Sequence, residues 1–155
     1  MTIGIDLRCV PGDGSPGAGV AHAARAMTTA LMSLGAEGVT WQLYTPELLG
    51  SVSGFALRRA LKKYPCDVLF VPSGAVAPWL DVECVPWVHD VAIFEHPEWF
   101  GESFFRRIVT TMLFWRGLNK AKHILAVSED TKRELVRLLG IDSHAIVVTH
   151  EGGDD

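Results

Sequence analysis

The chain has 155 residues, of which 48% are hydrophobic and 21% charged, and its formal net charge is −4. This length and balance predict one globular domain and exclude a disordered chain. The negative charge argues against bulk electrostatic binding to nucleic acid. Cys9, Cys66 and Cys84 form neither a metal-ligand spacing nor a disulfide framework, so we expect free, buried thiols in a reducing compartment.

The start of the chain carries charge almost at once, at Asp6 and Arg8. That leaves no room for the apolar core of a signal peptide. No apolar run has the length of a membrane span. We therefore expect a cytoplasmic domain.

Strand and helix patterns alternate along the chain. Apolar and β-prone runs predict six strands, at residues 3–7, 40–44, 66–71, 84–88, 123–127 and 145–149. Helical patterns predict four long helices, at residues 20–34, 51–64, 101–120 and 128–139. On the second of these, the spacing predicts that Phe55, Ala56, Ala60 and Leu61 face inward.

This alternation predicts an α/β fold: a Rossmann-like, doubly wound, mostly parallel sheet of about six strands with helices on both faces. We assign residues 1–150 to the domain. The tail, residues 151–155, has the composition of a linker, and we expect it to begin a connection to a second domain that these 155 residues do not include.

Residues 85–100 pass from a buried strand into a polar loop that carries His89, Asp90 and His96. In open α/β sheets, ligands bind where strands end at their carboxyl side. His89 is therefore the strongest candidate for chemistry in the sequence. The alternative is a histidine that only caps the strand or bonds a loop carbonyl.

The glycine-rich loop before the first helix allows three interpretations. Residues 12–17 satisfy G-x-G-x-x-G, but Pro16 lies inside the motif and no acidic residue ends the second strand, which disfavours a dinucleotide site. Residues 17–19, Gly-Ala-Gly, could let backbone N–H groups approach an anion or a sugar hydroxyl. A turn without a ligand is the third interpretation.

Other polar residues have mainly structural interpretations. The spacing of His89, Glu95, His96 and Glu98 matches no compact ligand set, so we expect no metal. Ser128 lacks the strained turn of a nucleophile and is expected to cap a helix. His150 follows the last strand, again at a carboxyl end.

The helix predicted at residues 101–120 carries more aromatic and aliphatic mass than one core face needs, together with arginines. It could rest on a membrane surface as a peripheral contact, at the inner face of the membrane. The alternative is packing against a partner domain or the domain's own sheet.

Five runs in order along the chain carry a family resemblance: residues 3–8, 17–20, 88–90 with 96–100, 126–135, and 147–152. On these the chain resembles the N-terminal half of retaining glycosyltransferases of the GT-B architecture, in the group-one or family-four class. The resemblance implies transfer of a sugar from a nucleotide-sugar donor to a sugar or lipid-linked acceptor. It implies no cofactor and no metal.

In that family the N-terminal domain mainly binds the acceptor. The resemblance implies that His89, with Asp90 beside it, lies next to the transferred sugar. A neutral imidazole at a strand end can hydrogen-bond a sugar hydroxyl, and Asp90 or a loop carbonyl could fix its tautomer. It also implies that the backbone of Gly17, Ala18, Gly19 and Val20 faces the donor phosphates. The remaining positions expected to line the cleft are Arg8, His96, Ser128, Thr131, His150, Glu151 and Gly152.

The sequence departs from the family pattern at Ala18 and Ala21, where glycines are common. Because the donor pocket of such enzymes lies in a second domain, we expect these 155 residues to be inactive alone. A competing interpretation is a non-catalytic Rossmann-like module that forms a homodimer through its cleft face. A dinucleotide-dependent oxidoreductase domain is a third.

Overall fold

The computed structural model describes residues 1–12, 19–99 and 103–150. Six strands form one sheet in the order β2-β1-β3-β4-β5-β6, and every neighbouring pair is parallel. The strands are β1 (Thr2–Asp6), β2 (Thr40–Tyr44), β3 (Val68–Val71), β4 (Glu83–Val88), β5 (Ile124–Ala126) and β6 (Ile146–Val148). This confirms the predicted Rossmann-like sheet.

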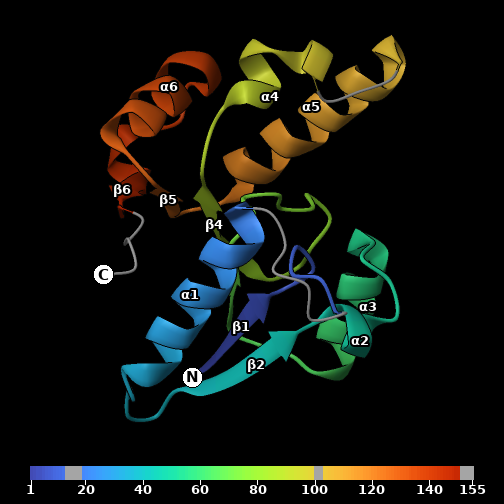
Figure 1. Cartoon of the computed structure of the whole chain (residues 1–155), viewed down its shortest axis with the longest axis vertical. Helices are drawn as coiled ribbons and strands as arrows, with labels where there is room; N and C mark the ends of the chain where they lie inside the picture. Colours follow the sequence, from blue (N-terminus) through green and yellow to red (C-terminus); the bar gives the residue numbers. More distant parts are fainter. Residues whose placement is uncertain (13–18, 100–102, 151–155) are drawn as a thin grey trace.

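The helices lie around this sheet (Figure 1). They are α1 (Gly19–Ser33), α2 (Pro46–Leu49), α3 (Gly54–Lys63), α4 (Ala92–Glu95), α5 (Phe104–Lys120) and α6 (Glu129–Leu139), with 3₁₀ turns η1 (Pro97–Trp99) and η2 (Ser143–Ala145). Ser53, Ser103 and Ser128 each accept a hydrogen bond from the backbone of the helix that follows, which fixes where α3, α5 and α6 begin. Gly140, at φ +66°, ends α6 in the left-handed conformation.

The two faces of the sheet bury different residues, because side chains alternate along a strand. Ile5, Phe70 and Trp87 form one cluster, to which α1 contributes Ala23 and Met27. The other face carries two clusters. Leu57 of α3 packs with Leu69 and Val71, and Leu118 of α5 and Leu135 of α6 pack with Val88, Ile124 and Ala126. Helices therefore cover both faces, as predicted.

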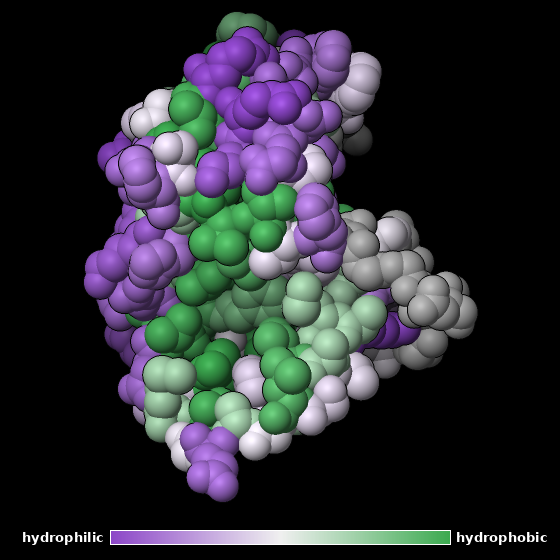
Figure 2. Space-filling model, turned by 90° about the vertical axis from the view of Figure 1, so that its left-hand side faces the viewer, coloured by the Kyte–Doolittle hydropathy of each residue, from purple (hydrophilic) through white to green (hydrophobic). Residues whose placement is uncertain are grey.

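On the face of the sheet that α1 covers, apolar side chains remain at the surface near β5 and β6. Among the helices of the described residues, only α1 supplies side chains to the Trp87 cluster. Val127 is half-buried beside this cluster, and Val147 of β6 is 52% exposed. Figure 2 shows apolar surface over much of the side on which α1 and β6 lie, with the hydrophilic side chains of α6 above it.

The direction in which successive strands are added to the sheet reverses at one point. The chain moves from β1 outward to β2, then returns past β1 to β3 and continues to β4, β5 and β6. The topological switch point therefore lies between β1 and β3, where ligands bind in open α/β sheets. The segment from β3 to β4 contains turns but no helix, and it packs Val76 and Leu80 into the core.

Several local predictions were wrong. Phe55 is 69% exposed and stacks on Trp79, with ring centroids 5.1 Å apart, while Ala56 and Leu57 are the buried residues of α3. The short elements α4 and η1 occupy a segment predicted as a loop, and α2 occupies one to which no element was assigned. A single turn of helix has no periodicity to detect. Helix α5 begins at Phe104, after its cap at Ser103, rather than at residue 101.

The described residues include no helix with the length and apolar character needed to span a bilayer. The three cysteines are free; Cys84 is buried, and Cys9 and Cys66 are partly buried.

Candidate functional site

The carboxyl ends of β3 and β4 and the N-terminus of α1 surround a small pocket of about 170 Å³. His89 and Asp90 follow β4, Ser73 follows β3, and Val20 lies in the first turn of α1. These four residues line the pocket together with Val88, Ile93 and Phe114. The structure thus brings His89 to the start of α1, although the two are far apart in the sequence.

The imidazole of His89 is fixed by a backbone carbonyl. Its Nε2 lies 2.7 Å from the oxygen of Pro72, at the end of β3. Because a carbonyl oxygen can only accept, Nε2 carries the proton, and a neutral ring has Nδ1 as its acceptor. The ring also contacts the indole of Trp87, with centroids 4.7 Å apart. Partial burial and these contacts hold the ring at the pocket wall.

The carboxylate of Asp90 bonds the backbone that follows it. It accepts a hydrogen bond of 2.9 Å from the amide of Ala92, the first residue of α4. Of the two groups expected to fix the His89 tautomer, the loop carbonyl of Pro72 is therefore the one bonded to the ring. Asp90 is exposed and lines the pocket.

Ser128 and Thr131 connect the start of α6 to the backbone of His89. Ser128 Oγ accepts from the amide of Thr131 at 3.1 Å, which confirms the predicted cap. The two hydroxyl oxygens lie 3.1 Å apart, and Thr131 Oγ1 donates to the carbonyl of His89 at 3.4 Å. Thr131 is 8% exposed. These bonds position the turn that carries His89.

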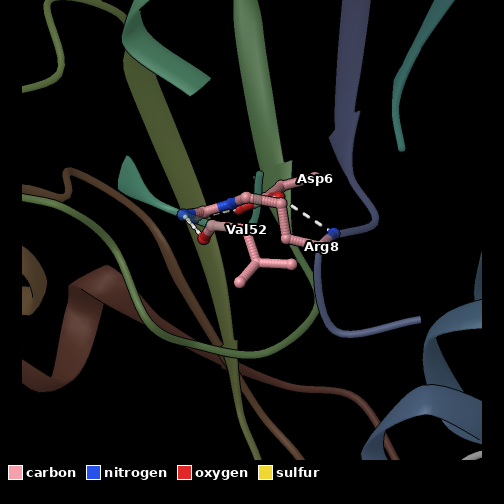
Figure 3. Close-up of polar contacts among 3 residues, drawn as sticks. All are labelled: Asp6, Arg8 and Val52. Carbon is pink, nitrogen blue, oxygen red and sulfur yellow. Dashed lines mark hydrogen bonds and ion pairs between the residues drawn. The ribbon is translucent and has the colours of Figure 1, made fainter. Parts of the chain in front are cut away.

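Arg8 lies after β1 at the switch point, but its guanidinium is bonded to the protein itself (Figure 3). Its Nε and one terminal nitrogen contact the Asp6 carboxylate at 2.8 and 2.6 Å, and the other terminal nitrogen donates to the carbonyl of Val52 at 3.1 Å. The Arg8 side chain is 14% exposed and that of Asp6 only 2%. The pocket beside His89 is not lined by Arg8.

His96 and His150 lie outside the pocket. His96 follows α4, where its ring stacks on Trp99 at 4.1 Å and its Nδ1 contacts the Glu98 carboxylate at 3.1 Å. A backbone hydrogen bond, with a smaller contribution from His96, lowers the pKa of Glu98. His150 is exposed after β6.

Some expected positions fall outside the described residues: Gly17 and Ala18, Glu151 and Gly152, and most of the 12–17 glycine motif. Gly19 and Val20 are described and form the start of α1. No three His, Cys, Asp or Glu side chains within residues 1–12, 19–99 and 103–150 are grouped so that they could hold a metal.

Sequence reasoning did not identify Pro72 and Ser73 as part of the site, nor the lining residues Val88, Ile93 and Phe114. The Pro72 carbonyl and Ser73 follow β3 at the switch point, and the same carboxyl-end rule that singled out His89 could have found them. The ion pair between Asp6 and Arg8 was not predicted. The sequence position of an acidic residue within a strand does not indicate which basic residue it will contact.

Comparison with known proteins identifies the family of the chain. A search of curated proteins finds no match. The sequence profile described as Glycosyltransferase Family 4 matches residues 17–155, which include α1, the His89 turn and the Ser128 cap. This match covers most of the chain, and the six-stranded parallel sheet agrees with it. The chain therefore belongs to glycosyltransferase family 4.

Proposed function

We propose that these 155 residues form the acceptor-binding domain of a retaining GT-B glycosyltransferase, which moves a sugar from a nucleotide-sugar donor to an acceptor hydroxyl. The observation that carries the proposal is the position of His89. Its imidazole lies at the carboxyl end of β4, on the wall of a pocket that also reaches the start of α1. Family membership supports the reaction class.

His89 suits a role beside the transferred sugar. Transfer of a glycosyl group passes through a transition state with oxocarbenium character, which gains from oriented polar groups in a site with little water. The Pro72 carbonyl and the Trp87 ring fix the orientation of the imidazole before a ligand arrives. An imidazole fixed in this way can hydrogen-bond a sugar hydroxyl without the entropic cost of first orienting its ring.

The start of α1 suits the donor phosphates. The first N–H groups of this 15-residue helix have no partner within the helix itself, and the positive end of the helix dipole lies at Gly19 and Val20. Gly19 and Val20 are exposed, which leaves the start of the helix accessible to a ligand. Binding by backbone amides needs neither a metal nor a cofactor, and we propose that the reaction uses none.

A nucleotide-sugar cleft needs a second wall that binds the nucleotide. We propose that a second domain, on the same or another chain, supplies it and that the 155 residues alone have no transferase activity. The non-catalytic homodimer is not favoured, because the family match is to a glycosyltransferase family.

The test is an NMR titration of the chain with neutral mono- and disaccharides, a lipid-linked saccharide, and uridine, guanosine and adenosine diphosphate sugars. We expect weak saccharide binding that shifts the signals of His89, Ser73 and Val20. His89→Ala should abolish these shifts. His144→Ala is the matched control, because the His144 side chain is 92% exposed at the remote turn η2.

Two results would oppose the proposal separately. Saccharide-induced shifts that spare the pocket around His89 would refute the acceptor role. Hydrolysis or transfer of a nucleotide sugar by the purified 155 residues would refute the need for a second domain.

A further inference from the structure

Helix α5 exposes an unusual amount of apolar surface. Gly117 and Leu118, near its C-terminus, are its buried residues. Its N-terminal half extends away from the sheet (Figure 1). The exposed large apolar side chains are Phe104, Phe105, Ile108, Val109, Met112 and Trp115, with Phe104 and Phe105 exposed by 71% and 76%.

These six residues lie on one side of the helix. At about 100° per residue, they fall within an arc of roughly 140°. They therefore form one continuous apolar stripe, which we call the α5 stripe. The side turned to the sheet is a different one, which carries Leu118 and the half-buried Phe114.

A groove of about 560 Å³ runs beside the α5 stripe, between α5, the α4–η1 segment and the end of α6. Its walls are mainly apolar, formed by Phe94, Ile108, Met112, Trp115, Leu138 and Leu139. Arg107 and Glu98 also line it, and Glu98 is the carboxylate that contacts His96.

The charge on α5 is opposite to that of the whole chain. The helix carries Arg106, Arg107, Arg116 and Lys120 and no acidic residue, while the chain has a net charge of −4. Lys120 donates to the carbonyls of Leu80 and Pro78, and the Arg107 guanidinium lies 5.9 Å from the Phe104 ring. Arg106 and Arg116 are exposed.

A second basic helix shows that charge alone does not make such a surface. Helix α3 carries Arg58, Arg59, Lys62 and Lys63, but Phe55 is its one large apolar side chain that is mostly exposed, and that ring stacks on Trp79. Within the described residues, α5 is the helix that combines an exposed apolar stripe with basic side chains and no acidic ones.

We propose that the α5 stripe and the groove beside it dock on a lipid bilayer that contains anionic phospholipids. Aromatic and aliphatic side chains enter the boundary between headgroups and acyl chains, while Arg106 and Arg116 contact phosphates. Glu98 lines the groove, but α5 itself carries four basic residues and no carboxylate. This one-sided charge favours an anionic lipid surface over a protein partner, whose surface commonly carries both signs of charge. The proposal does not rest on the sugar-transfer reaction.

The test is co-sedimentation of the 155-residue chain with vesicles of phosphatidylcholine mixed with phosphatidylglycerol, and with vesicles of phosphatidylcholine alone. We expect binding to the anionic vesicles, at least several-fold weaker binding to the neutral ones, and a decrease with added salt. Quenching of Trp115 by brominated lipid, assigned with Trp115→Phe, should show that its indole enters the bilayer.

Paired variants separate docking from folding. Phe105→Ser combined with Ile108→Ser should weaken vesicle binding by about tenfold or more. Leu34→Ser, which changes an apolar residue 75% exposed beyond the far end of α1, should not weaken it. Arg106→Glu with Arg116→Glu should weaken binding to the anionic vesicles, and Arg133→Glu on α6 should not. Circular dichroism checks that each variant is folded.

Two results would overturn the proposal. The first is vesicle binding by folded Phe105→Ser, Ile108→Ser protein that equals that of the unchanged chain. The second is a stable dimer in solution, without lipid, that the same substitutions dissociate; the α5 stripe would then be an interface between two copies.

Discussion

The Nε2 of His89 lies 2.7 Å from the carbonyl oxygen of Pro72, so the end of β3 fixes the ring at the end of β4. The bond crosses between neighbouring strands at the carboxyl edge of the sheet, one strand away from the switch point. The histidine is therefore both a structural link and a wall of the pocket. The bond to a loop carbonyl expected from the sequence is confirmed, and a chemical role for His89 stays a prediction.

This bond predicts the tautomer of His89. A neutral ring should carry its proton on Nε2, because the Pro72 oxygen can only accept. Long-range ¹H–¹⁵N spectra of the neutral imidazole would identify the protonated nitrogen. A neutral ring protonated at Nδ1 would contradict the prediction, and the exposed His144 provides a reference ring in the same spectrum.

The Ser128 cap predicts a measurable contribution to stability and to the site. Ser128→Ala removes the acceptor for the Thr131 amide and should lower the free energy of unfolding by about 1 kcal/mol. Because Thr131 also bonds the His89 carbonyl, the NMR signals of the His89 turn should shift as well. Ser128→Asp keeps a capping oxygen and should preserve most of the stability.

The pair of Asp6 and Arg8 predicts an asymmetry between its two members. Arg8→Met leaves the carboxylate of Asp6, 2% exposed, without its cation and should destabilise the fold by about 3–5 kcal/mol. Asp6→Asn should cost less, because the Arg8 side chain is more exposed and can reach water. Urea unfolding of both variants measures the difference. A double variant that lost the sum of the two costs would show that the pair is not coupled.

The contact between α5 and the β3–β4 connection predicts that Gly117 does not tolerate a side chain. A methyl group there would overlap the carbonyl oxygen of Val76, so Gly117→Ala should lower the free energy of unfolding by about 1–3 kcal/mol. Gly19→Ala is the control, since its Cβ would meet nothing within 4 Å. Thermal unfolding should show a lower midpoint for the first variant only.

The buried thiol of Cys84 predicts a loss of stability at alkaline pH. Burial raises the pKa of Cys84 from 9.0 to about 11, and burial also raises those of Tyr44 and Cys66 in the same cluster. As pH rises above 9, the unfolded chain loses a proton that the folded chain keeps, so the unfolded state is favoured. The free energy of unfolding should fall from about pH 8 to about pH 11, and less steeply in Cys84→Ala. An equal slope in both proteins would contradict this assignment.

Repeating patterns in the sequence were enough to predict the sheet and to place His89 at its carboxyl edge, while the role of His89 there stays a prediction. Continuous apolar runs such as 68–71 identify strands buried on both faces, and the rule for carboxyl ends identified His89. Contacts between distant segments were beyond such patterns. Phe55 turns outward because Trp79 offers a stacking surface, and Arg8 turns away from the pocket because Asp6 and Val52 bind it. Neither partner is marked by spacing along the chain.

The irregular connection between β3 and β4 has a mechanical consequence. At one end, the carbonyl of Pro72 holds the ring of His89. Further along, Val76 packs against Gly117, and the carbonyls of Pro78 and Leu80 accept from the ammonium of Lys120. Gly117 and Lys120 lie in the last turn of α5. This stretch therefore contacts both the imidazole and the last turn of α5, and a substitution that shifted its backbone would displace groups at both places.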